Sequence, residues 1–195
     1  GPFFRLALAE RDFDAAWKVV EEVRRGAMIG RASRTSRPRK GDKSQASYLA
    51  ALIHLKKGEP ARALAEVEVL RQTFSEQKND KRLELNLLEV QGLYQCATGA
   101  GAGGVKSLQK AVDKTKNDYS HHAWGNGAYY MEAWGVGALL CNKPDVAEEA
   151  FHEALAHDPG SVRAALGMQV VCERQGRSEE VERYAALARR CWARA

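Results

Sequence analysis

Between residues 46 and 70, two stretches with the spacing of an amphipathic helix are separated only by Gly58-Glu59-Pro60. Apolar side chains recur every three or four residues before this break and again after it. Glycine supplies the positive φ at which many helices end, and proline suits the first turn of the next helix. The pattern therefore predicts two antiparallel helices joined by a tight turn.

The same pattern recurs along the chain, with copies that start near residues 44, 85, 128 and 162. The intervals are 41, 43 and 34 residues, and the two longer ones carry extra residues at 78–84 and 119–127. We expect these extra residues to lengthen helices or to form exposed loops. No segment shows the alternation that predicts a strand between hairpin turns. We therefore expect an all-α chain in which successive hairpins cover one another's apolar faces.

Residues 128–161 resemble a tetratricopeptide repeat. Ala147, Phe151 and Ala154 stand at the characteristic positions of its second helix, and Asp158-Pro159 ends it. Gly135 stands where that family places a small residue, so that two helices can approach closely. The resemblance is specific over 128–195 and looser over 44–195. It implies an α–α superhelix, or solenoid, of antiparallel helix hairpins with a concave groove.

We expect the chain to have three parts. Residues 1–25 form a partial N-terminal repeat or a cap, residues 26–43 form a flexible basic loop, and residues 44–195 form the repeats. The repeats span about 44–77, 85–118, 128–161 and 162–195. The Gly1-Pro2 start is typical of the scar left by cleavage of a tag. The half repeat at the N-terminus suggests an array that begins inside a longer chain, or a first helix that serves as a cap. The glycine-rich run at 98–104 predicts an unusually flexible turn within the second repeat.

The resemblance also implies a set of partner-binding residues, because the first helix of each tetratricopeptide pair lines the groove. The matching positions are Tyr48, Leu52, Asn86, Glu89, Leu93, Tyr129, Glu132, Val136 and Arg163. This stripe is apolar along its middle and polar at its edges, which suits an amphipathic helix or an extended peptide. Alternatively, its Leu and Val members only pack between adjacent pairs. Tyr48, Tyr129, Glu89 and Glu132 are then the better candidates for contact.

The positive charge of the chain is concentrated in one segment. Net charge is +5, but residues 24–43 carry eight Arg or Lys against Asp42, so this segment has +7 and the remainder −2. Candidate phosphate-binding residues here are Arg31, Arg34, Arg37, Arg39 and Lys40. The alternative is a solvated loop that binds nothing. Ser33, Thr35 and Ser36 lie beside these arginines, where phosphorylation would cancel much of the charge.

No pattern indicates catalysis, a cofactor or a metal site. The glycine run at 99–104 lacks the preceding strand and the Gly-Lys-Ser/Thr ending of a phosphate-binding loop. His152 and His157 are five residues apart, about 140° around a helix, and so cannot hold one metal ion together. The four cysteines are too widely spaced for a zinc site and are expected to be reduced. We therefore expect no enzymatic activity and no cofactor.

The sequence as a whole favours an interaction protein. Its composition, 45% hydrophobic and 28% charged, is that of a soluble globular chain, and the uncharged stretch 133–142 is too short to span a bilayer. We expect a non-catalytic scaffold, a segment of a larger multi-subunit protein complex, that binds a peptide or helix of a partner protein in its groove. The alternative is an RNA-binding helical-repeat protein that uses residues 24–43. Reduced cysteines favour an intracellular, cytoplasmic location, and the oligomeric state is left open.

Overall fold

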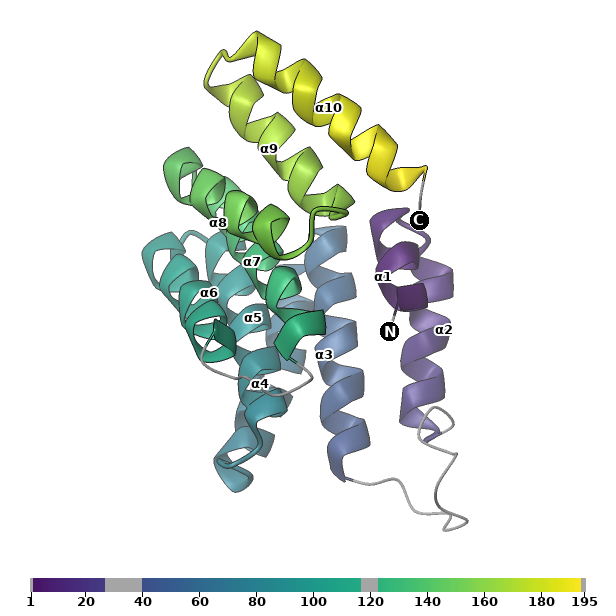
Figure 1. Ribbon diagram of the computed structural model, residues 1–195. Helices are drawn as coiled ribbons and strands as arrows, with labels where there is room; N and C mark the ends of the chain where they lie inside the picture. Colours follow the sequence, from purple (N-terminus) through teal and green to yellow (C-terminus); the bar gives the residue numbers. More distant parts are fainter. Residues whose placement is uncertain (1, 27–39, 117–122, 194–195) are drawn as a thin grey trace. The chain divides into compact units, whose positions relative to one another are not determined.

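The computed structural model describes residues 2–26, 40–116 and 123–193. Over these residues all regular secondary structure is α-helical, in ten helices (Figure 1). They are α1 (Pro2–Ala9), α2 (Phe13–Arg24), α3 (Lys40–Lys57), α4 (Pro60–Glu76), α5 (Lys81–Ala97), α6 (Gly101–Lys116), α7 (Ala123–Leu140), α8 (Pro144–His157), α9 (Val162–Arg174) and α10 (Ser178–Trp192). The all-α class predicted from the sequence is therefore confirmed.

The chain forms two compact units, residues 1–90 and 91–195, and the boundary between them falls within α5. In the first unit, α1 packs on α2, α2 on α3, and α3 on α4. In the second unit, each helix from α6 to α10 packs on the next, and α7 also contacts α9 (Figure 1). From α1 to α4, and again from α6 to α10, each helix is thus a neighbour in space of the next one in the sequence.

The turns follow the glycine and proline pattern of the sequence. Gly58 and Gly176 have φ of 74° and 71°, in the left-handed region where a Cβ atom is disfavoured. Asn142 takes the same role between α7 and α8, with φ of 53°, and asparagine tolerates that conformation better than most residues. Pro60 and Pro144 lie in the first turns of α4 and α8. These residues hold the paired helices in tight hairpins.

A single aromatic ring lies at the centre of the second unit. Phe151 in α8 is fully buried, and a Cβ atom added to Gly135 in α7 would lie 2.5 Å from its Cε1 atom. A Cβ atom on Gly167 in α9 would lie 2.4 Å from Cζ of the same ring. Ala147 and Ala154 are also fully buried on α8. Small residues therefore bring α7 and α9 onto the Phe151 ring, which is the close approach predicted for Gly135.

Polar contacts establish the directions of the helices in the second unit. Glu132 and Leu139 of α7 contact Arg163 and Arg174 of α9, in that order. Glu148 and His152 of α8 likewise contact Arg177 and Tyr184, at the start and middle of α10. In each pair of helices, the contacts run from the start toward the end of both helices. Helix α7 is therefore parallel to α9, and α8 is parallel to α10. The last two hairpins are therefore stacked in the same orientation.

The first unit has a core of small and branched side chains. Ala16 and Val20 of α2, Ile53 of α3, and Val67 and Leu70 of α4 are fully buried. At its edge, Trp17 meets the His54 ring in an edge-on contact with centroids 5.3 Å apart. Helix α1 is only eight residues long.

One expected boundary differs from the structure, whereas the extra residues at 78–84 behave as expected. Helix α3 begins at Lys40, so the end of the segment expected to be a loop, residues 40–43, is helical. The rest of that segment, residues 27–39, lies outside the described residues. Among the extra residues at 78–84, those from Lys81 onward lengthen α5, and residues 77–80 form the turn before it. The polar residues and lysines at the starts of α3 and α5 do not break a helix. The local sequence therefore defines where these two helices begin only loosely.

The turn predicted at 98–104 is shorter in the structure. Only residues 98–100 connect the helices, and α6 already begins at Gly101. A Cβ atom on Gly104 would lie 2.6 Å from Cys96 Sγ and 2.6 Å from the carbonyl oxygen of Gly92. Gly104 therefore allows close contact between α5 and α6, and Gly99, with φ of 92°, serves the turn itself.

Candidate functional site

The start of α9 is fixed to α7 by one hydroxyl group. Ser161 is the N-cap of α9, and its Oγ accepts a hydrogen bond of 3.0 Å from the Ala164 N–H. The same hydroxyl donates to Oε1 of Glu132 on α7 at 2.5 Å. Ser161 was not among the predicted site residues, although a serine directly before a helical stretch is a recognisable N-cap signal. Its two bonds orient the Glu132 carboxylate.

Three of the predicted groove residues meet beside this cap. The Arg163 guanidinium lies 3.6 Å from Oε2 of Glu132 and 5.6 Å from the centre of the Tyr129 ring. Such a position over an aromatic face favours a cation. The Arg163 side chain is 42% exposed, whereas that of Glu132 is 13% exposed and Tyr129 is buried. Residues from two successive hairpins thus form one cluster with an accessible cationic group.

The surface continues from this cluster along both helices. Val136 follows Glu132 by one turn of α7 and is half-buried, as is Val170 on α9. Farther along, Arg174 donates a hydrogen bond of 2.8 Å to the carbonyl oxygen of Leu139, near the end of α7. The α7–α9 face is defined here as Tyr129, Glu132, Val136, Arg163 and Val170. It combines one accessible guanidinium with a short apolar stripe, and hydrogen bonds hold it at both ends.

The remaining predicted groove residues are buried. In the first unit these are Tyr48, Leu52, Asn86 and Glu89, and in the second unit Leu93. Tyr48 donates a hydrogen bond of 2.7 Å to Oε2 of Glu89, and Glu89 is fully buried. A buried carboxylate is costly unless it is hydrogen bonded. Tyr48 and Glu89 thus join α3 to α5 inside the first unit, and little of either side chain is accessible.

The candidate phosphate-binding residues Arg31, Arg34, Arg37 and Arg39 lie outside the described residues. Lys40 begins α3. Nearby, Arg24 is held by two carboxylates, at 2.8 Å from Glu21 and 3.8 Å from Glu66, and its guanidinium lies 5.9 Å from the Trp17 ring centre. Arg24 therefore joins α2 to α4, and its charge is partly balanced within the fold.

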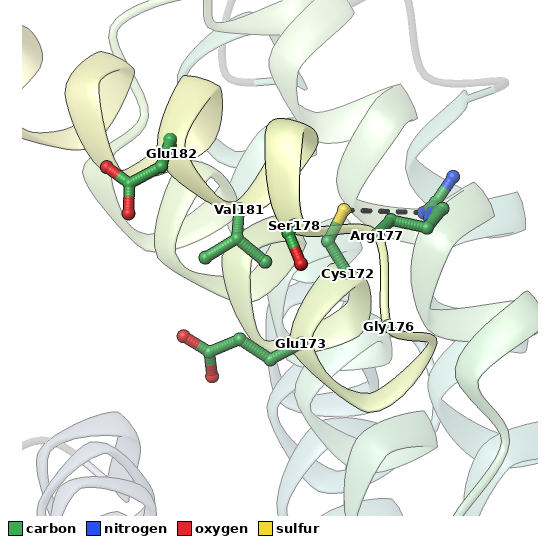
Figure 2. Close-up of a pocket in the computed structure, with 7 residues that line it drawn as sticks. All are labelled: Cys172, Glu173, Gly176, Arg177, Ser178, Val181 and Glu182. Carbon is green, nitrogen blue, oxygen red and sulfur yellow. Dashed lines mark hydrogen bonds between the residues drawn. The ribbon is translucent and has the colours of Figure 1, made fainter.

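A shallow hollow of about 390 Å³ lies at the turn between α9 and α10 (Figure 2). Arg177 donates hydrogen bonds to Glu148 at 2.8 Å and to Cys172 Sγ at 3.4 Å on one side of it. Burial raises the pKa of the Cys172 thiol, and the nearby Arg177 charge opposes this only in part. Because the thiolate is the reactive form of cysteine, Cys172 is poorly suited to act as a nucleophile here.

A second cysteine is equally protected. Burial, together with a hydrogen bond to Cys141, raises the pKa of Cys96 to about 12. All four cysteines are free thiols, and Cys96 and Cys172 are buried. In residues 2–26, 40–116 and 123–193 there is no group of three or more His, Cys, Asp or Glu side chains placed to hold a metal ion.

No helix in the described part of the chain combines the length and the apolar character needed to cross a bilayer. No protein-family model matches the chain, and no curated protein matches it either.

Proposed function

We propose that the chain is a tetratricopeptide-like helical-repeat protein that binds a segment of a partner protein on the α7–α9 face, without catalysing a reaction. In this proposal the hairpins form a solenoid and serve as a scaffold within a larger complex. The observation that supports it most directly is the contact of Arg163 with both Glu132 and Tyr129. These three residues come from two hairpins, and each occupies a predicted groove position.

The chemistry of the face indicates the kind of segment it would hold. Val136 and Val170 provide half-buried apolar surface, and burying further apolar area there contributes about 25 cal/mol per Å². Arg163, 42% exposed, is suited to a carboxylate because guanidinium and carboxylate groups match in geometry. From Arg163 to Val170 the helix rises about 10 Å. An amphipathic helix of about two turns, with apolar residues and one acidic residue on the same side, fits this pattern.

The test begins with a displayed library of random helical peptides that is selected on the wild-type chain. Binding of the selected peptides is then measured by calorimetry against Val136→Glu and Arg163→Glu. We expect each substitution to weaken binding at least tenfold, because one places a charge on the apolar stripe and the other reverses the cationic group. Arg183→Glu, an equal charge change at an exposed position on α10, is the matched control and leaves binding unchanged.

Helical content of every variant is compared by circular dichroism, since a folding defect would imitate a binding defect. If the selected peptides bind all three variants as tightly as the wild type, the proposed site is wrong. If peptides of unrelated pattern are selected, with neither apolar periodicity nor acidic residues, the proposed chemistry of the partner is wrong.

A second candidate function, RNA binding, is supported by the local charge of +7 over residues 24–43. Phosphate contacts release counterions, so affinity would fall steeply with salt. Replacement of Arg31, Arg34, Arg37 and Arg39 by serine would then lower both the affinity for single-stranded RNA and the slope of its salt dependence. An unchanged slope in the four-fold variant would exclude this role. Peptide binding to the α7–α9 face would be unaffected by either result.

A further inference from the structure

One side of the last hairpin carries exposed apolar side chains and separated charges. On α10, Glu182, Ala185, Arg189 and Trp192 follow one another at three- and four-residue intervals and so share one stripe. Leu166 and Glu173 lie on the neighbouring α9. Trp192 is 54% exposed and Leu166 is 48% exposed, while the adjacent stripe of α10, Tyr184 and Ala188, is buried. These six exposed or half-buried residues are called the end face.

The two ends of this face have opposite character. Glu173 and Glu182 both line the hollow at the α9–α10 turn, where Figure 2 shows them on either side of Val181. Arg189 and Trp192 lie about 10 and 15 Å farther along α10. Near that end, the Cys191 thiol donates to the carbonyl oxygen of Pro159 at 3.5 Å, which holds α10 against the start of α9. The end face is therefore acidic and hollow at one end, and basic and aromatic at the other.

We propose that two copies of the chain associate through their end faces, with α10 of one copy antiparallel to α10 of the other. A two-fold axis that crosses α10 between Ala185 and Ala186 places Arg189 of each copy opposite Glu182 of the other. The same axis places each Trp192 opposite the beginning of the other α10, beside its hollow. One surface thus supplies both partners of each contact, as a two-fold interface requires.

Packing is compatible with this arrangement. The residues nearest the axis, Ala185 and Ala186, are small and half-buried, so two α10 helices can approach closely. The hollow of about 390 Å³ is open to solvent and has room for an indole ring. An exposed tryptophan that enters a cavity on the facing copy is a typical anchor of a protein interface. Among the described residues neither Glu182 nor Arg189 forms an ion pair within its own chain, so both can pair across the interface.

The size of the face predicts a weak dimer. The fifteen-residue α10 is about 22 Å long. Two helices packed 8–10 Å apart give a surface of roughly 400 Å² per copy. A stable interface of standard size buries about 800 Å² per partner. We therefore expect a weak, reversible dimer, weakened several-fold between 50 and 500 mM NaCl by screening of its ion pairs.

Sedimentation equilibrium of the full chain, from about 1 to 500 µM, tests the proposal. The dimer contains two equivalent contacts between positions 182 and 189. In either variant, Arg189→Glu or Glu182→Arg, both contacts join like charges, so we expect each substitution to raise the Kd at least tenfold. When the two variants are mixed in equal amounts, a dimer with one copy of each again joins opposite charges at both contacts. The mixture is therefore expected to recover the wild-type Kd within about threefold. Trp192→Ala, which removes the anchor, is expected to weaken the wild-type dimer by a similar factor.

Arg190→Glu is the matched control, because it makes the same charge change one position along α10, about 100° away from the end face. It should leave the Kd unchanged, and circular dichroism confirms that all variants are folded. A chain that is monomeric at 500 µM, a dimer insensitive to both single reversals, or a mixture that fails to recover dimerisation would each overturn the proposal. None of these results depends on partner binding at the α7–α9 face, since Arg189, Glu182 and Trp192 lie outside it.

Discussion

Phe151 of α8 and Gly167 of α9 are so close that a Cβ atom on Gly167 would lie 2.4 Å from Cζ of the ring. Atoms cannot approach to this distance, and because Phe151 is fully buried its ring has little room to move. Replacement of Gly167 by alanine therefore requires α8 and α9 to separate. Overpacking of this kind costs about 1–3 kcal/mol. We expect Gly167→Ala to lower the free energy of unfolding by that amount, as measured by urea denaturation.

The control for this prediction is Gly103→Ala in α6. There the nearest atom that a new Cβ would meet, in Gln95, is 3.7 Å away, an ordinary contact. Since alanine is a better helix former than glycine by about 0.8–1 kcal/mol, this variant should be at least as stable as the wild type. Equal destabilisation by both substitutions would show that close packing on Phe151 is not the cause.

The hydrogen bond between Tyr48 and the buried Glu89 gives a second prediction. Tyr48→Phe keeps the ring but removes the hydroxyl that donates to Glu89 Oε2 at 2.7 Å. Loss of one bond to a buried charged group costs about 1–3 kcal/mol. Tyr94→Phe on the same helix as Glu89 is the control, because within the described residues the Tyr94 hydroxyl makes no hydrogen bond. Urea denaturation should show a loss for Tyr48→Phe alone.

The lowered pKa of Glu59 predicts how the stability of the folded chain depends on pH. A hydrogen bond with His54 Nδ1 at 2.7 Å is the main cause that lowers the pKa of Glu59 below its ordinary value of 4.5. A carboxylate with a lowered pKa stabilises the folded state above its unfolded-state pKa, and this contribution is lost as pH falls through the lower, folded-state value. The difference in stability between wild type and Glu59→Gln should therefore be present at pH 5 and shrink as pH falls below 4.5, through the lowered pKa of Glu59.

A second pair of variants identifies the source of this effect. In a His54→Phe background, the edge-on contact with Trp17 can be kept while the hydrogen bond to Glu59 is removed. The acid-dependent part of the Glu59→Gln difference should then be smaller, when followed by urea denaturation at each pH. An equally large acid-dependent difference in both backgrounds would mean that His54 is not the main cause.

The raised pKa of Cys96 predicts selective protection from alkylation. Because burial and the hydrogen bond to Cys141 raise this pKa to about 12, almost no thiolate forms at pH 8, and the thiolate is the form that reacts. Iodoacetamide at pH 8 should modify the half-buried Cys191 of the folded chain well before Cys96, as measured by peptide mass spectrometry. In urea, both should react at similar rates. Equal rates in the folded chain would contradict the prediction.

The helices and turns were largely predictable from the sequence, whereas their exact limits were less so. The helix, glycine and proline pattern around Gly58 and Pro60 predicted the α3–α4 hairpin, and the small residue at Gly135 predicted close packing in the second unit. The glycine run at 98–104 is conformationally permissive in isolation, so the sequence predicts a longer turn there than the structure has. The helical part includes Gly104, whose close contacts with Cys96 and Gly92 no local pattern reveals.

The candidate site was predictable in part. Tyr129, Glu132 and Arg163 were predicted separately from two repeats, and the structure brings them together. Ser161, which orients Glu132, was missed, since its second hydrogen bond joins it to a residue 29 positions away. The hollow beside Glu173 and Glu182, which underlies the proposed dimer, also has no signature in the sequence.

The sequence by itself determined the all-α class and the places of the tight turns, because helical periodicity, the positive φ of glycine and the ring of proline act over a few residues. Only the tertiary structure decided which predicted surface residues are accessible. Tyr48 and Glu89, 41 positions apart, are buried together, whereas Arg163 remains 42% exposed. Burial depends on neighbours that are distant in the chain, so it is determined by how the hairpins pack on one another.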